Sequence, residues 1–214
     1  MNEFNEKNFT RKPDLAANDG LTCYLGQGAQ QNLTAFNVFY NFLYEIRPKR
    51  ILEVGTGLGG FTYFLKLTID ELELDTKIRT YDTNRFSSQK ILEENGVDLR
   101  IENIFSQDYM KVISQEVIEY IQEPGITLVL CDGGFKIGEF NLLSEFIKPG
   151  DFIMAHDYSC NREYFEEHVN RKIWNWIEIE DTNIENASSV FNLVPFMPSE
   201  FQEAVWVCKR KQQK

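Results

Sequence analysis

Three residues that follow apolar runs have side chains able to do acid–base or metal chemistry. Asp132 follows the run ITLVLC and precedes two glycines, and His156 and Asp157 follow the run Phe152–Ala155. An imidazole beside a carboxylate can act as a general base. Two carboxylates and an imidazole can also bind Mg²⁺ or a transition metal. Asp132, His156 and Asp157 are therefore candidate catalytic residues and, as an alternative, candidate metal ligands. In a third, purely structural interpretation, Asp157 forms a turn and His156 packs in a cleft.

A glycine-rich turn between a strand and a helix predicts a site for an anionic or nucleotide-type ligand. In RILEVGTGLGGFTYF, residues 50–64, apolar residues give way to glycines and then to a helical pattern. The first N–H groups of a helix lack intrahelical partners and carry partial positive charge. A carboxylate or phosphate can lie against them. The cofactor-binding residues expected here are Glu53, Gly55, Thr56, Gly57 and Gly59.

The ligand of this turn has two interpretations. Gly55-x-Gly57-x-x-Gly60 matches the dinucleotide fingerprint, so an NAD-dependent oxidoreductase is one alternative. Glu53 stands two residues before the first glycine, where a carboxylate can accept hydrogen bonds from an ammonium group. The chain also shows no Tyr-x-x-x-Lys pair and no separate substrate domain. These features favour a cofactor that carries an amino acid.

Acidic residues also follow the next two predicted strands. Asp82 ends the run IRTYD, where nucleotide-binding α/β folds place an acid on the ribose hydroxyls. Asp108 follows a strand predicted over residues 99–105 and is expected at the adenine edge, with Asp132 also near the cofactor. The alternative for Asp82 and Asp108 is to cap the next helix. Parallel strands bring all these residues to one rim of a sheet, which is where such folds bind ligands.

Alternating apolar runs and amphipathic segments predict a Rossmann-like, doubly wound α/β fold. Strands are expected over residues 51–54, 78–82, 99–105, 126–131, 152–155, 176–180 and 204–209. Helices are expected over residues 32–46, 61–72, 87–95, 109–121, 139–147 and 162–173. We predict a seven-stranded, mostly parallel sheet with helices on both faces.

The whole chain, residues 1–214, is expected to form one domain. Residues 1–48 are assigned to a polar N-terminal loop and a cap helix, residues 49–158 to a cofactor-binding core, and residues 159–214 to an acceptor-side region with the last strands. Residues 1–28 should contain a mobile end and an ordered loop. The segment around Pro195 and Pro198 should form a lid, or a short helix and loop.

Composition excludes several classes of protein. The chain has 22 Lys and Arg against 33 Asp and Glu, and only residues 209–211 concentrate basic charge, so we expect no broad nucleic-acid surface. Apolar residues make up 43% of the chain, which rules out a disordered protein. Four scattered cysteines indicate reduced thiols, and no stretch is typical of a signal peptide or a membrane span. A cytoplasmic protein without membrane contact is therefore expected.

Glu53-x-Gly55-x-Gly57-x-Gly59 resembles the first motif of class I S-adenosylmethionine-dependent methyltransferases. Across residues 26–158, the segments LVLCDGG and KPGDFIMAHDY are similar to the cephalosporin hydroxylase-like and catechol O-methyltransferase-like branches. The resemblance implies that Asp132 and Asp157 bind a divalent metal that holds the acceptor's hydroxyls. His156 replaces the usual first member of the acidic pair. Lys136 resembles the lysine base of the catechol enzymes, at an offset one residue longer.

Together these features predict an S-adenosylmethionine-dependent methyltransferase that methylates an oxygen of a small hydroxylated or glycosyl acceptor. The acceptor would lose its proton with the help of a metal or of His156 as base. A non-catalytic nucleotide-binding or assembly protein with the same fold is the alternative from another class. No pattern in the sequence identifies the acceptor or the oligomeric state.

Overall fold

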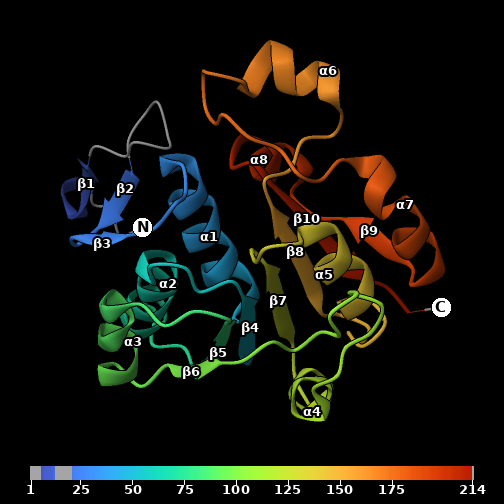
Figure 1. The fold of residues 1–214 in the computed structure, drawn as a ribbon, viewed down its shortest axis with the longest axis horizontal. Helices are drawn as coiled ribbons and strands as arrows, with labels where there is room; N and C mark the ends of the chain where they lie inside the picture. The colour runs from blue at the N-terminus through green and yellow to red at the C-terminus, as the bar shows by residue number, and fades with distance from the viewer. Residues whose placement is uncertain (1–5, 13–20, 214) are drawn as a thin grey trace.

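A seven-stranded sheet forms the centre of the computed structural model, which describes residues 6–12 and 21–213 (Figure 1). Its order is β6-β5-β4-β7-β8-β10-β9. The strands are β4 (Arg50–Val54), β5 (Lys77–Asp82), β6 (Asp98–Ile101), β7 (Thr127–Cys131), β8 (Phe152–His156), β9 (Leu193–Pro195) and β10 (Trp206–Lys211). The first five run parallel, and β10 is antiparallel to β8 and β9. The predicted mostly parallel, seven-stranded sheet is confirmed.

Both faces of the sheet are buried under helices. Successive residues of β7 alternate between two apolar cores: Leu128 and Leu130 belong to one, Val129 and Cys131 to the other. This alternation follows from the two-residue period of a strand. It explains why the run is apolar at every position, as in a parallel strand covered on both sides.

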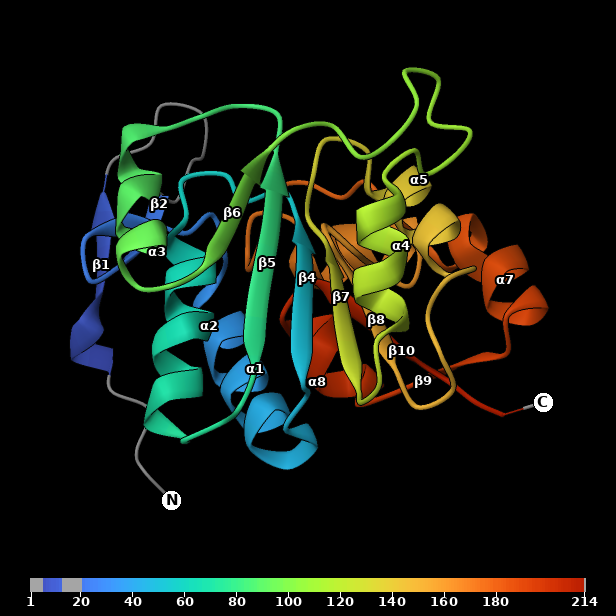
Figure 2. The ribbon, with the colours of Figure 1, turned by 90° about the horizontal axis from the view of Figure 1, so that it is seen from below.

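Figure 2 shows the helices on the two faces of the sheet. One core is closed by α1 (Leu33–Ile46), α2 (Gly60–Glu71), α3 (Lys90–Glu94) and α8 (Pro198–Glu203). The other is closed by α4 (Gln115–Gln122), α5 (Lys136–Leu143) and α7 (Asp181–Val190). α1 begins at the N-cap Asn32, whose side chain accepts a hydrogen bond from Ala35 N at 2.8 Å. Among the described residues, no helix is both long and apolar enough to cross a bilayer.

The N-terminal region differs from the expected loop. After a 3-10 turn, η1 (Glu6–Asn8), the strands β1 (Phe9–Lys12), β2 (Leu21–Tyr24) and β3 (Gln27–Gly28) form a small antiparallel sheet beside α2 (Figure 1). Tyr24 explains its position, because its ring packs against Phe36 of α1 and Phe64 of α2 with centroids 6.2 and 5.3 Å apart. The mobile end predicted within residues 1–28 stays a prediction, because residues 1–5 and 13–20 lie outside the described residues.

The helix predicted over residues 109–121 is too long at its start. Residues before Ser114 form a turn, in which Ser106 Oγ accepts hydrogen bonds from the backbone N–H groups of Met110 and Lys111. Phe105 and Val112 form an isolated bridge. The side chain of Ser106 thus offers the backbone an alternative to helical hydrogen bonds. The strand predicted over residues 99–105 is also shorter in the structure, where β6 ends at Ile101.

Three C-terminal predictions need correction. Residues 176–180 form no strand and contribute one bridge, between Tyr158 and Ile179. The helix predicted over residues 162–173 is divided into a single turn, α6 (Arg162–Tyr164), and a π-helix, η3 (Phe165–Val169). The last strand begins at Trp206 because α8 and a turn occupy residues 198–205. The segment around Pro195 and Pro198 therefore forms the strand β9 and then the short helix α8. The prediction of a short helix in this segment was correct.

Candidate active site

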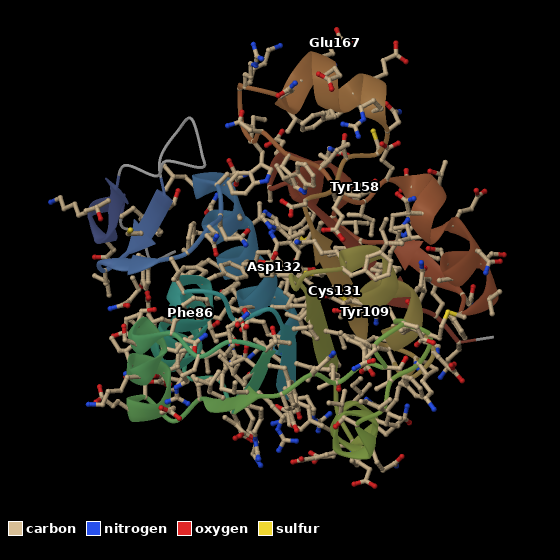
Figure 3. The ribbon with its side chains drawn as sticks, viewed as in Figure 1. Phe86, Tyr109, Cys131, Asp132, Tyr158 and Glu167 are labelled. Carbon is tan, nitrogen blue, oxygen red and sulfur yellow. The ribbon has the colours of Figure 1, made fainter. Side chains whose placement is uncertain are left out.

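The turn after β4 is packed against the turn after β7. Gly55 has φ +93°, and a Cβ at this position would lie 2.1 Å from the carbonyl oxygen of Asp132. The N–H of Asp132 donates to Val54 O at 2.8 Å. Only glycine allows this approach with this backbone conformation. Asp132 is thereby fixed beside the glycine turn, near the centre of the molecule (Figure 3).

Asp82 fixes the other side of the glycine turn. Its Oδ2 accepts a hydrogen bond from Gly57 N, and its Oδ1 accepts one from Asn84 N, both at 2.8 Å. The end of β5 and the glycine turn are thus held together by one carboxylate. This is the position in which the sequence predicted a ribose-binding acid.

Two cavities meet at these turns. One, of about 260 Å³, lies on the Asp82 side and includes Phe105 and Glu139 in its lining. The other, of about 270 Å³, includes Glu53, Lys136 and His156. Four residues line both cavities: Gly55, Gly57, Asp132 and Gly133. The turns after β4 and β7 therefore form a shared wall along which one elongated ligand can lie.

His156 and Asp132 face each other in the second cavity. His156 Nδ1 lies 3.1 Å from Asp132 Oδ1 and 3.5 Å from Asp157 Oδ1. The other oxygen of Asp132 accepts a hydrogen bond from Gln31 Nε2 at 2.8 Å, and Gln31 Oε1 accepts one from Trp206 Nε1 at 2.8 Å. His156 Nε2 is buried and has no hydrogen-bond partner. The imidazole is thus oriented through Nδ1, and Nε2 is left without a hydrogen-bond partner.

Lys136, the first residue of α5, places a cation in the same cavity. Its Nζ lies 2.9 Å from Asp157 Oδ2 and donates to Gly133 O at 2.9 Å. Glu178 Oε2 is 3.5 Å away and Asp132 Oδ1 is 3.8 Å away. The backbone N–H of Lys136 also donates to Glu178 Oε1 at 2.7 Å. Three carboxylates from three chain segments therefore surround one ammonium group.

Burial and charge shift the pKa values of this cluster in opposite directions. Burial lowers the pKa of His156, but the carboxylates of Asp157 and Asp132 outweigh it and the net pKa is raised. Burial also lowers the pKa of Lys136, and the charges of Asp132 and Asp157 again reverse the effect, so its pKa is raised. Burial raises the pKa of Asp157, while His156 and Lys136 lower it below its usual value. Asp157 and Lys136 are therefore both charged at neutral pH.

Glu53 is buried beneath the glycine turn. Its Oε2 accepts hydrogen bonds from Thr62 Oγ1 at 2.6 Å and from Thr80 Oγ1 at 2.5 Å. Burial raises the pKa of Glu53 to about 7, although these two hydrogen bonds lower it. Thr56, whose Oγ1 lies 2.6 Å from Thr80 Oγ1, extends this polar group toward the cavity.

The arrangement does not fit the predicted metal site at Asp132, His156 and Asp157. Within residues 6–12 and 21–213, no group of three or more His, Cys, Asp or Glu side chains could hold a metal ion. Each carboxylate oxygen of Asp132 and Asp157 already faces a nitrogen, and the Lys136 ammonium lies among them. A divalent cation bound to these oxygens would be repelled by the adjacent ammonium. The metal prediction is therefore not supported, because a lysine supplies the local positive charge.

Two predicted cofactor-binding residues line neither of these cavities. Asp108 accepts hydrogen bonds from Ser106 Oγ at 2.6 Å and from Met110 N at 3.2 Å, so it stabilises its own turn. Residues 102–105 line the first cavity instead. Gly59 is the N-cap of α2, with φ +85°. The structure brings the other predicted residues together: Glu53, Gly55, Thr56, Gly57, Asp82, Asp132, His156 and Asp157.

Two residues of the site, Gln31 and Glu178, were missed from the sequence. Gln31 precedes a helix N-cap and has no motif around it. Trp174 Nε1 donates to Asp157 Oδ1 at 2.7 Å, and Glu178 N donates to Asp157 O at 2.8 Å. Trp174 and Glu178 lie in a segment without regular periodicity. Their only sequence signal was the aromatic content of that segment.

The fold and the site together define a class I methyltransferase: a sheet of this order, a glycine turn after β4, and an acid at the end of β5. The model of the family "Rhamnosyl O-methyltransferase/CmcI" matches residues 20–176, and the chain belongs to this family. A comparison with curated proteins gives no match. The family assignment confirms the prediction of an S-adenosylmethionine-dependent O-methyltransferase. It also implies a small-molecule acceptor.

Solved structures of CmcI have a similar fold. The apo structure of CmcI superposes with a TM-score of 0.62 at 13% sequence identity, covering 95% of this chain and 82% of that chain. CmcI with Mg-SAM superposes with a TM-score of 0.57 at 14% identity, covering 98% of this chain and 86% of that chain. CmcI with SAH gives a TM-score of 0.57 at 11% identity, covering 100% of this chain and 94% of that chain.

Proposed function

We propose that this chain transfers the methyl group of S-adenosylmethionine to a hydroxyl oxygen of a small hydroxylated or glycosyl acceptor, with His156 as general base. One observation carries the proposal: the nucleoside-sized cavity beside Asp82 and the cavity of His156 share the wall formed by Gly55, Gly57 and Asp132. A ligand with a nucleoside at one end and a reactive group at the other fits along that wall.

The chain would hold the cofactor at three points. Asp82 accepts one N–H at each oxygen, and the remaining lone pairs can accept hydrogen bonds from ribose hydroxyls. The N–H groups at the start of α2 favour the cofactor's carboxylate. Glu53, buried below the turn, favours its ammonium group. These contacts would direct the sulfonium toward Asp132 and His156.

The reaction then requires a deprotonated acceptor in line with the methyl group. The bound sulfonium supplies an already activated methyl group. His156 Nε2 takes the proton of the acceptor hydroxyl, while Asp132 Oδ1 accepts the hydrogen bond from Nδ1–H and stabilises the imidazolium. The oxygen lone pair forms a bond to the methyl carbon, the carbon–sulfur bond breaks, and S-adenosylhomocysteine is released. His156 returns its proton to water.

The acceptor is expected to be small and uncharged or cationic rather than a nucleic acid, because the chain carries a formal net charge of −11. Cys131, Cys160 and Cys208 are free thiols, and Cys131 and Cys208 are buried. Free thiols of this kind support the expectation of a reducing compartment such as the cytoplasm.

The experiment that tests the proposal follows a labelled methyl group. Purified protein, S-adenosylmethionine with a labelled methyl group, and a panel of phenols and glycosides are incubated and the products separated. Label in an O-methyl ether, absent with His156→Ala, supports the proposal. Binding of S-adenosylhomocysteine without transfer to any acceptor would instead favour a non-catalytic protein with this fold.

A further inference from the structure

Lys136 occupies the position in the cavity where positive charge is needed. Its ammonium lies 2.9 Å from Asp157 Oδ2, 3.5 Å from Glu178 Oε2 and 3.8 Å from Asp132 Oδ1. Only 9% of the Lys136 side chain is exposed. Three carboxylates so close together would repel one another without a cation between them. In this chain that cation is the ammonium group of Lys136.

The carboxylate oxygens around Lys136 already have nitrogen partners. Asp132 uses one oxygen for Gln31 and one for His156. Asp157 uses one for Trp174 and one for Lys136. Each partner is a nitrogen that donates or shares a proton, whereas a metal requires oxygen lone pairs directed at one point. Each of these four oxygens therefore has a nitrogen partner without a metal.

Lys136 is also held rigidly. Its backbone N–H donates to Glu178 Oε1, its Nζ donates to Gly133 O, and the backbone of Glu178 is tied to Asp157 O. A preorganised charge of this kind stabilises a developing negative charge without reorganisation. Lys136 and His156 line the same cavity, so the charge of the ammonium acts on an acceptor bound there.

We propose that the ammonium group of Lys136 takes the place of a divalent cation in this site and that methyl transfer by this protein needs no metal. This inference rests on the proposed function. Lys136 neutralises Asp132, Asp157 and Glu178 and stabilises the acceptor oxyanion electrostatically. His156 remains the group that takes the proton.

The test measures Mn²⁺ binding by electron paramagnetic resonance, with S-adenosylhomocysteine present and absent. Wild-type protein should leave the spectrum of free Mn²⁺ unchanged at concentrations where a carboxylate site would be filled. Lys136→Met removes the charge and should tighten Mn²⁺ binding by at least about tenfold, because the carboxylates then lack a cation. Lys148→Met is the matched control: it removes a partly buried lysine beside Asp151, at the opposite end of β8, and should behave as wild type.

Each outcome decides the inference. Mn²⁺ binding by wild type that Asp132→Asn abolishes would overturn it, and so would a folded Lys136→Met that binds no Mn²⁺. If Lys136→Met does not fold, Lys136→Gln replaces it, and the wild-type titration stands by itself. Methyl transfer that persists in excess chelator supports the inference, and transfer that stops and is restored by Mg²⁺ contradicts it. Failure of S-adenosylhomocysteine to bind would overturn the proposed function separately.

Discussion

His156 is the last residue of β8 and Asp132 directly follows the neighbouring parallel strand β7, and their side chains face each other with Nδ1 and Oδ1 3.1 Å apart. The strand ends explain the contact, because residues that directly follow adjacent parallel strands share one rim of the sheet. Asp132 thereby orients the imidazole, and Nε2 is left without a hydrogen-bond partner.

Replacing Asp132 by Asn should impair catalysis more than binding. The amide cannot stabilise the imidazolium, so we expect methyl transfer to fall by roughly 10²- to 10⁴-fold. The affinity for S-adenosylhomocysteine should change little. Labelled-methyl assays and calorimetry measure the two quantities. Asp181→Asn, which alters a carboxylate bonded to Tyr158 OH outside the site, is the control. Equal losses in both variants would contradict the assigned role.

Replacing Gly55 by Ala should unfold or distort the glycine turn. The added Cβ would lie 2.1 Å from Asp132 O at a positive φ, and we expect a loss of about 3 kcal/mol in the free energy of unfolding. S-adenosylhomocysteine binding should be lost. Gly96→Ala is the matched control, since Gly96 also has positive φ but no atom within 4 Å of the added Cβ. This variant should lose only about 1 kcal/mol in the free energy of unfolding, as measured with urea, and should still bind S-adenosylhomocysteine.

The affinity for S-adenosylhomocysteine should rise with pH through neutrality. Burial raises the pKa of Glu53 to about 7, and the ligand's ammonium group favours the ionised carboxylate. Protonation on lowering the pH from 7.5 to 6 should therefore weaken binding roughly eightfold. Calorimetry at several pH values measures this slope. Glu53→Gln should bind more weakly with no slope over this range, and an unchanged slope in that variant would exclude Glu53 as its source.

Glu53 should also make stability pH-dependent. Its pKa is 4.5 when unfolded and about 7 when folded, so the folded state binds the extra proton. The free energy of unfolding should consequently fall as pH rises between these two values. Urea unfolding of wild type and Glu53→Gln measures the difference, which should be largest above pH 7. A wild-type stability that instead rises relative to the variant would contradict the buried state of Glu53.

Gln31 and Trp206 should act as one unit that orients Asp132. Trp206 Nε1 donates to Gln31 Oε1, and Gln31 Nε2 donates to Asp132 Oδ2. Gln31→Leu leaves the buried indole N–H unpaired and should cost about 1–3 kcal/mol in stability and reduce methyl transfer. Adding Trp206→Phe should cost less than the sum of the single changes in a double-mutant cycle. Additive effects would show that the two residues act separately.

Much of the fold followed from periodicity. The continuous apolar run ITLVLC was predictable as a strand, and helical spacing indicated the helix over residues 32–46. The N-terminal sheet was missed because β3 has only two residues. In addition, β1 and β2, which pair with each other, are separated in the sequence by residues 13–20. Residues 109–114 were assigned to a helix because their apolar spacing was helical, yet Ser106 captures their N–H groups.

The site was predictable only where residues end strands. Asp82, Asp132 and His156 follow apolar runs, so their convergence could be expected from topology. Glu178 and Trp174 reach the site from an irregular segment, and no local pattern records a contact made across 17 or more residues. The same limit applies to the metal prediction: the sequence shows the carboxylates but not that the Lys136 side chain lies among them.

The central claim is that the wall between Asp82 and His156 binds S-adenosylmethionine. Titration calorimetry with S-adenosylhomocysteine, and in parallel with NAD, tests it most directly. The account predicts one bound S-adenosylhomocysteine per chain, binding weakened at least about tenfold by Asp82→Ala because the ribose hydrogen bonds are lost, and no NAD binding. NAD binding without S-adenosylhomocysteine binding, or an affinity that Asp82→Ala leaves unchanged, would contradict it.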